Sequence, residues 1–360
     1  DDDPEDRWEG LEIDQAFYSV DLGRLLRDTL KPSRELEVDL TVGRQFIHLG
    51  TGLAFNSVVD GFSLTTLYGD FCVKLFGAKS NHDEDDVDTS RPGCEHMNRT
   101  FWGGQVDYVG MRSHTPYFFF MRQSDHNTER TEVLQDFKYD SYYLGLGIRG
   151  ELAERLGYYA EHIREGGKST AQTDFDFLNQ RQEIIAEACN VGLDYMPICR
   201  FQPHFALQYV HGSGDDDRIS VAEADRGNLG NTNDYGFLAF GYVFAGYSLE
   251  PDVSNINIIR FGASAKFLEE HEAFSDLELG FDYFNYWKDE REGGISDYRA
   301  VVRMDQPERN DIGDELDLRL DWRIFSDLSF TARFGMFWTG DAYEDDVRRD
   351  FLVLGLTLSF

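Results

Sequence analysis

The end of the chain places the strongest constraint on its fold, because its side chains alternate between apolar and small or polar. Leucine occupies positions 352, 354, 356 and 358, and valine, glycine, threonine and serine occupy the positions between and after them. Successive side chains of a strand point to opposite faces, so this pattern predicts a strand with a leucine row on one face only. Such a strand, which ends on Phe360, suits a sheet whose outer face meets lipid. It equally suits the last strand of a soluble sandwich.

The same two-residue period recurs in about fifteen segments along the chain. It is clearest in 315–324, where leucine, tryptophan and isoleucine face one way and charged side chains face the other. One more strand is expected because both ends of a bacterial barrel lie on one side, which gives about 16 strands in a range of 14–18. The aromatic, glycine-rich stretch 236–249 fits either a strand or a packed loop. Residues 1–360 are therefore expected to form a single all-β domain.

Two kinds of connection separate these segments. Short ones occur near 113–116, 149–152, 196–200, 268–273 and 325–327, and long acidic ones near 80–100, 165–181, 211–234, 288–312 and 340–348. A soluble sandwich has no reason to gather its long loops at one end, so the alternation predicts a transmembrane antiparallel β-barrel with short periplasmic turns and long extracellular loops. The acidic core of 80–100 carries too much like charge to pack, which predicts a solvated surface loop.

Composition agrees with a membrane barrel and argues against other classes. No run approaches the roughly 18 apolar residues of a spanning helix, whereas a barrel needs only alternating segments of about 10. The formal net charge of -33 argues against a nucleic-acid partner, because phosphates need a basic surface. The absence of a signal peptide carries no information, since a mature exported chain has lost it. We therefore expect a protein of the Gram-negative outer membrane, in contact with the lipid bilayer and with lipopolysaccharide.

Charged residues on the inner face favour a water-filled interior, or lumen, over a dry core. Burying the charged row 315–323 would cost several kcal/mol per ion unless each charge were well paired. Charged groups along a pore set its selectivity, so these inward side chains are the candidate selectivity residues. They are Lys74, Arg122, Arg149, Arg155, Glu161, Arg260, Lys266, Asp317, Arg319, Asp321, Arg323 and Arg333. Their alternative role is salt bridging to neighbouring carboxylates, and the sequence leaves both roles open.

The signs of these charges are mixed. Asp317, Arg319, Asp321 and Arg323 lie at two-residue spacing, which predicts an alternating column with neighbours about 7 Å apart. Opposite charges at that spacing in water attract by only about half a kcal/mol, so solutes can compete for each group. We therefore expect a channel without strong anion selectivity.

Metal and redox chemistry have little support in the sequence. The cysteines show no metal or haem spacing, and their disulfide pairing cannot be read from sequence; they are Cys72, Cys94, Cys189 and Cys199. One acidic run offers clustered oxygens for calcium in an extracellular loop, and it consists of Asp215, Asp216 and Asp217. The run does not match the EF-hand spacing, so the competing interpretation is a solvated acidic loop. No other cofactor is expected.

Two further classes of function are compatible with a barrel. A lipase-like barrel enzyme would need a serine and a histidine together, and His204 and Ser213 are the nearest candidates. No GxSxG motif is present, and His204 is placed on the inner face, so we expect no enzyme. A structural shell around a partner protein is the third class.

Several short motifs between about residue 35 and the end carry a family resemblance. They are Gly43-Arg44-Gln45, Asp60-Gly61, Tyr158-Tyr159-Ala160-Glu161, Gln202-Pro203-His204, Gly212-Ser213-Gly214-Asp215 and Gly340-Asp341-Ala342-Tyr343. By these motifs the chain resembles the alginate-export family of outer-membrane porins. The resemblance implies a monomeric passive channel for hydrophilic solutes, such as oligosaccharides or other charged carbohydrate. The best-known member of that family passes a polyuronate through an arginine-rich lumen, whereas the inner wall expected here has mixed charge.

Overall fold

A computed structural model gives the fold of most of the chain. It describes residues 14–24, 26, 36–81, 84–90, 94, 96–127, 137–171, 180–224, 228, 232–268, 270–271, 274–297 and 308–359. Phe360, expected at the end of the last strand, lies outside these ranges. No helix among the described residues is long and apolar enough to cross a bilayer.

The described residues form fifteen strands, within the expected range and one fewer than the expected number. They are β1 (Ala16–Asp21), β2 (Leu36–His48), β3 (Asn56–Tyr68), β4 (Phe71–Ser80), β5 (Arg99–Tyr108), β6 (His114–Asp125), β7 (Asp140–Ala153), β8 (Leu156–Ala171), β9 (Gln180–Tyr195), β10 (His204–Gly212), β11 (Ile256–Ala265), β12 (Leu277–Trp287), β13 (Asp311–Arg323), β14 (Leu328–Thr339) and β15 (Arg348–Leu358). Each strand pairs with the next along the chain, and the pairings are antiparallel.

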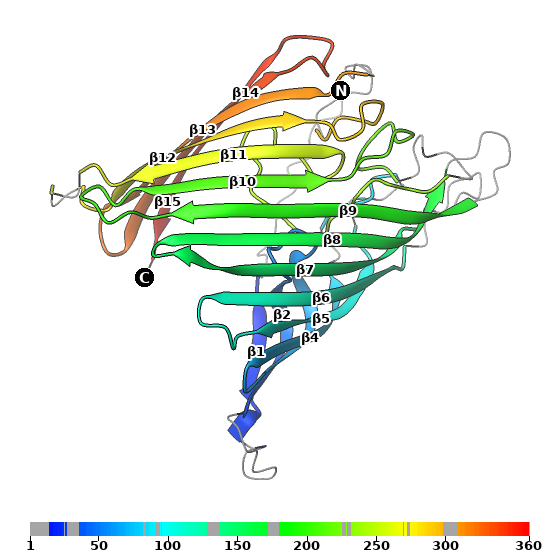
Figure 1. The fold of residues 1–360 in the computed structure, drawn as a ribbon, viewed down its shortest axis with the longest axis horizontal. Coiled ribbons are helices and arrows are strands. Elements are labelled where there is room, and N and C mark those ends of the chain that lie inside the picture. The colour runs from blue at the N-terminus through cyan, green and yellow to red at the C-terminus, as the bar shows by residue number, and fades with distance from the viewer. Residues whose placement is uncertain are drawn as a thin grey trace.

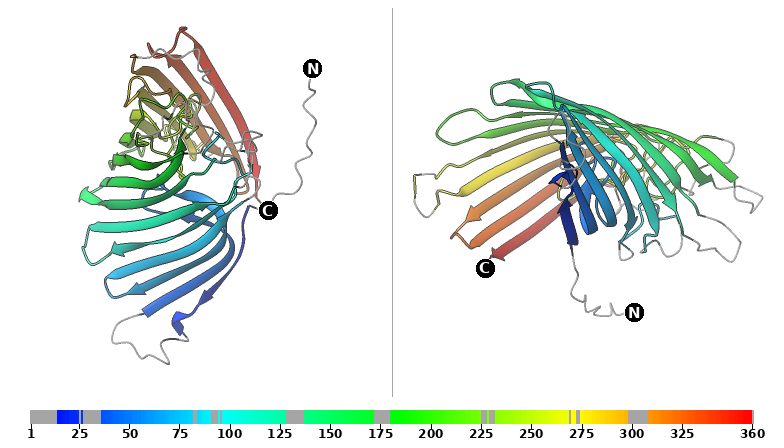
Figure 2. Two further views of the ribbon diagram at one scale, coloured as in Figure 1. Left: turned by 90° about the vertical axis from the view of Figure 1, so that its right-hand side faces the viewer. Right: turned by 90° about the horizontal axis from the view of Figure 1, so that it is seen from below.

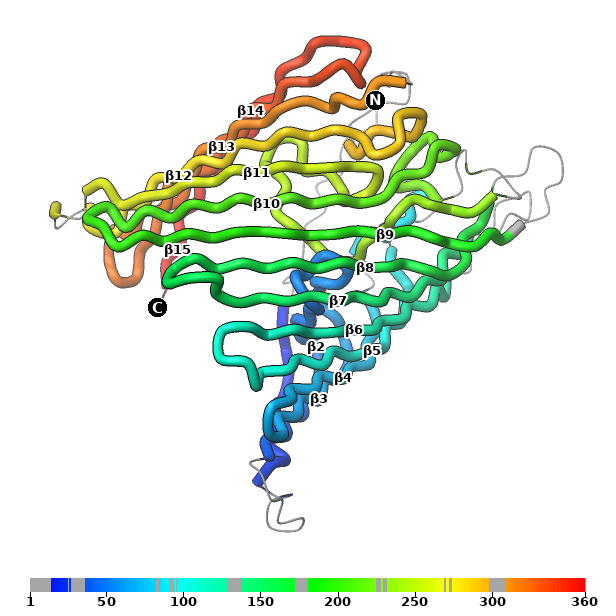
Figure 3. Tube along the Cα trace, viewed as in Figure 1, coloured from blue at the N-terminus to red at the C-terminus, as the bar shows by residue number. Residues whose placement is uncertain are grey.

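The sheet is an up-and-down meander that curls round its concave side. Figure 1 and Figure 3 show strands that are neighbours in sequence lying side by side from blue to red. Figure 2 shows the curvature of the sheet, whose two edges are β1 and β15. Short turns such as 69–70 lie at one end of the strands, and long connections such as 213–255 lie at the other. The predicted all-β architecture with unequal connections at its two ends is confirmed.

Apolar side chains cover the outer face of the sheet. Leu352 and Leu356 of β15 are 63% and 68% exposed. In β7, Leu144 and Leu146 are exposed on the outer face, while Tyr143, the residue before Leu144, is completely buried inside. A strand between lipid and a barrel interior requires this alternation, because its two faces meet different solvents.

Part of the chain lies inside the lumen. Residues 236–250, called here the inner segment, leave the wall after β10 and cross the interior before returning to β11. Phe240 forms backbone hydrogen bonds with the β2–β3 connection and the start of β3: its N–H donates to the carbonyl of Ala54 (3.1 Å), and its carbonyl accepts from the N–H of Asn56 (3.2 Å). The stretch 236–249, which the sequence left undecided, is therefore a packed loop.

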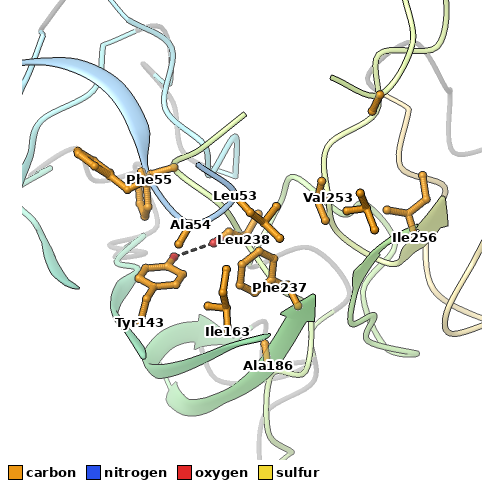
Figure 4. Packing of buried hydrophobic residues seen from close by; sticks show 14 of the residues in the cluster. Leu53, Ala54, Phe55, Tyr143, Ile163, Ala186, Phe237, Leu238, Val253 and Ile256 are labelled. Atoms are coloured by element: carbon orange, nitrogen blue, oxygen red, sulfur yellow. Dashed lines mark hydrogen bonds between the residues drawn. The ribbon is translucent and has the colours of Figure 1, made fainter. Parts of the chain in front are cut away.

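The inner segment has this position because its apolar side chains are buried only inside the barrel. Phe237 is completely buried and Leu238 is 3% exposed, among side chains from several strands and from the β2–β3 connection. Figure 4 shows Phe237 and Leu238 beside Tyr143, Ile163 and Ala186. The Tyr143 hydroxyl donates to the carbonyl of Leu238 at 2.6 Å, so the contact is also polar.

The acidic connection between β4 and β5 is packed, contrary to the expectation of a solvated loop. Asp86 and Asp88 are each 3% exposed in the described part of this connection. The Arg99 guanidinium, fully buried, lies 2.8 Å from Asp86 and 3.3 Å from Asp125. Asp88 accepts a hydrogen bond from the backbone N–H of Ala224 (3.1 Å) in the β10–β11 connection. The prediction failed because two carboxylates of the run are buried with partners from elsewhere in the chain, Asp86 with Arg99 and Asp88 with a backbone N–H group.

Substituting Arg99 with methionine should destabilise this end of the barrel strongly. The change leaves Asp86 and Asp125 buried without their cation, which typically costs about 3–5 kcal/mol. The free energy of unfolding from urea titration measures the loss. Arg44→Met is the matched control, because its partner Asp60 is about half exposed and such pairs contribute about 0–1 kcal/mol. Equal losses in the two variants would contradict the buried role of Arg99.

Candidate permeation pathway

A cavity of about 750 Å³ lies in the lumen beside the inner segment. Strands β6 to β11 form one side of it, and the β2–β3 connection and the inner segment form the other. Its polar and aromatic lining includes Thr51, Tyr117, Arg149, Tyr158, Tyr159, Asn190, Asp194, Gln208, Tyr242, Phe244 and Arg260. The inner segment therefore narrows the space through which a solute would pass.

Arg149 presents a partly free cation to this cavity. Its side chain is 47% exposed, and Nη2 lies 2.9 Å from Oδ1 of Asp107. The guanidinium also lies 5.4 Å from the ring centre of Tyr117, within the range of a cation–π interaction. The aromatic face and the carboxylate fix its position, while the exposed side remains open to a solute.

Arg260 is the second basic group in the lining of the cavity. It shares the carboxylate of Asp282 with a second arginine. Its Nη2 lies 2.7 Å from Oδ1 of Asp282, and Nη1 of Arg319 lies 3.3 Å from Oδ2 of the same residue. The Arg260 guanidinium also stacks over the ring of Phe244 from the inner segment, 5.0 Å from its centre. One carboxylate between two guanidinium groups leaves this part of the wall basic.

Buried wall carboxylates hold the inner segment in place. Glu315 accepts hydrogen bonds from the backbone N–H groups of Ser248 (2.6 Å) and Leu249 (2.9 Å). Asp317 accepts one from the N–H of Tyr247 (3.1 Å). Gly246 has a φ of +104°, and a Cβ there would lie 2.8 Å from the Glu315 carboxylate, so the close approach requires glycine.

Two glutamates of β8 also bind chain inside the lumen, one in the β2–β3 connection and one in the inner segment. Glu161 accepts from the backbone N–H (2.8 Å) and the hydroxyl (2.7 Å) of Thr51 in the β2–β3 connection. Glu165 accepts from the backbone N–H of Leu238 (3.0 Å). These acceptors satisfy backbone donors that would otherwise be buried without partners, at about 1–3 kcal/mol each.

The remaining part of the long β10–β11 connection is anchored by a buried ion pair. Arg218 and Asp234, both almost fully buried, lie 2.5 Å apart at Nη2 and Oδ2. Burial raises the pKa of Asp234, and the Arg218 guanidinium opposes that shift. The Asp234 N–H also donates to the carbonyl of Glu183 on β9 (2.8 Å), which fixes this connection to the wall.

The structure places half of the candidate selectivity residues on partly exposed positions of the inner wall. These are Lys74, Arg149, Arg260, Arg319, Asp321 and Arg333. Arg333 pairs with Asp321 at 2.5 Å, so both roles left open by the sequence, lumen exposure and salt bridging, occur in the same residues. Glu161 and Asp317 also face inward, but they are 3% and 1% exposed and support loops instead of facing solutes.

Four candidates lie elsewhere. Arg122 is exposed on the outer face, between the completely buried Met121 and Gln123. Arg155 lies in the β7–β8 turn with a φ of 64°, outside the strands. The remaining two are at the turn end of the barrel: Lys266 follows β11, and Arg323 ends β13 and donates to the carbonyl of Ser326. Of the predicted four-residue column, Asp317, Arg319 and Asp321 lie on the inner wall, and Arg323 is the last residue of β13, next to the turn.

The candidate calcium ligands are brought together in the β10–β11 connection. One carboxylate oxygen from each of Asp215, Asp216 and Asp217 lies within 4.8 Å of the others. Asp215 already accepts hydrogen bonds from the backbone N–H groups of Asp217 (2.9 Å) and Tyr235 (2.8 Å), which accounts for its burial. Calcium binding therefore stays a prediction. All four cysteines lie in described parts of the chain, and none forms a disulfide.

Comparison with known proteins decides the family. The family model for alginate export matches residues 3–352. The chain belongs to the alginate export family. Two residues of the resemblance motifs, Arg44 and Asp60, form a two-bond pair at 3.0 Å that joins β2 to β3. No curated protein matches the chain.

The fold is also similar to that of solved outer-membrane proteins. OccK11 (OpdR) from Pseudomonas aeruginosa matches with a TM-score of 0.51 and 13% identity, over 90% of this chain and 78% of that chain. The outer membrane protein OprD from the same organism matches with a TM-score of 0.50 and 15% identity, over 89% and 75%. This member of the alginate export family is thus a β-barrel of the outer membrane that forms a channel for solutes.

Proposed function

We propose that the channel carries hydrophilic solutes passively and selects them at the cavity beside the inner segment. The observation that carries the proposal is the lining of that cavity, where Arg149 and Arg260 lie among tyrosine rings, amides and Asp194. Aromatic faces with a few convergent polar groups suit ligands that have apolar faces and many hydroxyls. The solute class that fits is an oligosaccharide or another charged carbohydrate.

The channel should show no strong preference for anions or cations. Arg149, Arg260 and Arg333 each lie beside an inward carboxylate, so charges of both signs line the path of a solute. In a salt gradient across a planar bilayer, the permeability ratio of chloride to potassium should stay within about threefold of unity. An anion preference above about tenfold would contradict a mixed-charge wall.

Residue geometry does not favour the enzyme alternative. His204 begins β10, whereas Ser213 follows its other end, so the two side chains are about 30 Å apart along the strand. His204 instead pairs with Asp194 at 3.0 Å. A proton-transfer pair needs hydrogen-bond distance, so these residues do not form a hydrolytic site. We propose a non-enzymatic, monomeric channel in contact with lipopolysaccharide.

The structural-shell alternative makes a different prediction about conduction. A barrel that serves only as a scaffold needs no hydrated lumen. In that case the inner segment would have to close the lumen to ions. Conductance of the isolated barrel distinguishes these two proposals, because a shell conducts no current without its partner.

A further inference from the structure

A basic groove lies on the outer face of the barrel, away from the lumen. It has a volume of about 630 Å³ and is formed by β6, β7, β8 and β9 at the end of the strands that carries the long connections. Its charged lining consists of Arg122, Asp140, Lys168, Arg181 and Glu183. Sequence analysis assigned Arg122 to the lumen and assigned no role to the other four.

Two of these cations have no partner among the described residues. Arg122 and Lys168 are exposed side chains without a hydrogen bond or an ion pair there. Arg181 is already engaged, because its Nη2 lies 2.9 Å from Oδ2 of Asp140 and donates to the carbonyl of Lys168 at 2.6 Å. Asp140 accepts a second hydrogen bond from the backbone N–H of Asp125 at 2.9 Å.

The electrostatic balance of the groove favours an anion. Asp140 is neutralised by its own contacts, and Glu183 lies opposite Lys168 in the β8–β9 register. The groove thus holds three cations and two carboxylates, and Arg122 lies beside Tyr142 in the register, two residues along β7 from the carboxylate of Asp140. A guanidinium and an ammonium on two sides of one groove suit a compact, multiply charged oxyanion such as a phosphate.

The level of the groove along the strands, relative to the lipid bilayer, indicates which molecule would supply such a phosphate. In the register, Arg122 lies between Trp102 and Tyr142, both exposed on the outer face. Leu144 and Leu146, further along β7 toward the turn end, are exposed apolar residues of the same face. Aromatic residues of this kind mark the boundary between hydrocarbon and headgroups, so the unpaired cations are at headgroup level.

We propose that this groove binds a phosphate group of a phosphorylated lipid in the outer leaflet. The proposal rests on the position of the barrel in the outer membrane and is independent of the solute that the lumen carries. It assigns to Arg122 and Lys168 the two direct contacts with phosphate oxygens. Arg181 positions Lys168 through the carbonyl that it binds.

Native mass spectrometry of the detergent-solubilised barrel with lipid A tests the proposal. The double variant Arg122→Ala, Lys168→Ala should bind lipid A about thirtyfold more weakly, since each cation near a charged lipid surface contributes about fivefold to the affinity. Arg44→Ala is the control for a lost surface arginine: it removes one positive charge that is already paired with Asp60, and its lipid A affinity should change by less than about twofold. Both variants should keep the wild-type single-channel conductance, which shows that they are folded.

Two further binding measurements distinguish a lipid phosphate from free inorganic phosphate. Lipid A stripped of its phosphates should bind the wild type and the double variant equally weakly. Inorganic phosphate at about 10 mM should displace little phosphorylated lipid A, because acyl chains add to the lipid's affinity. Equal affinity of the double variant and the wild type for phosphorylated lipid A would overturn the proposal. Complete displacement by inorganic phosphate would also overturn it, by showing a general anion site.

Discussion

Replacing Glu315 with alanine should open the channel, raising its single-channel conductance about twofold or more. Glu315 is completely buried and accepts the backbone N–H groups of Ser248 and Leu249. Without it, two buried donors lose their acceptor, at about 1–3 kcal/mol each. Displacing residues 246–249 of the inner segment then costs about 2–6 kcal/mol less than in the wild type, and we expect the lumen to widen there.

Asp321→Ala is the control for the Glu315 experiment. It removes the same charge from the same strand, but Asp321 contacts Arg333 and not the inner segment. Its conductance should remain close to that of the wild type. If the two variants conduct alike, the inner segment does not limit the current, and the restriction must lie elsewhere in the barrel.

The second large effect should follow from removing both cavity arginines. The double variant Arg149→Ala, Arg260→Ala leaves Asp107 and Asp282 without these cations, so the narrow part of the lumen becomes acidic. Two charges at about 1 kcal/mol each in a hydrated pore should shift the potassium-to-chloride permeability ratio about tenfold or more toward potassium. Reversal potentials in a salt gradient measure the ratio.

Two arginines outside the cavity provide the control for this selectivity experiment. Arg155 and Arg323 were expected in the lumen, but Arg155 lies in the β7–β8 turn and Arg323 ends β13 at the same end of the barrel. The double variant Arg155→Ala, Arg323→Ala loses the same charge and should leave the permeability ratio within about twofold of the wild type. A shift as large as that of the cavity variant would place the turn residues along the path.

The strands could be predicted because the two faces of the wall meet different solvents. In 315–322 every second residue is apolar, so both the strand and its inward face follow from the sequence alone. Around Arg122 this alternation of apolar and polar residues is absent. The run 117–121 is aromatic or methionine throughout, because the inner segment makes the interior apolar at that level, and the inward face cannot be assigned.

The roles of the buried carboxylates could not be predicted, because they depend on distant parts of the chain. Glu315 binds backbone 66 and 67 residues away, and Glu161 binds Thr51 across 110 residues. Inward carboxylates look alike in sequence whether they meet water or a backbone N–H group. The available signal was the stretch 236–249, whose aromatic side chains have neither strand alternation nor the polarity of an exposed loop.

Single-channel recording of the purified wild-type barrel in planar bilayers tests the central claim most directly. A hydrated lumen narrowed by the inner segment predicts discrete conductance steps without added partner, and larger steps for Glu315→Ala. The absence of steps from both the wild type and Glu315→Ala, in protein shown to be folded and inserted, would contradict a channel and favour a structural shell.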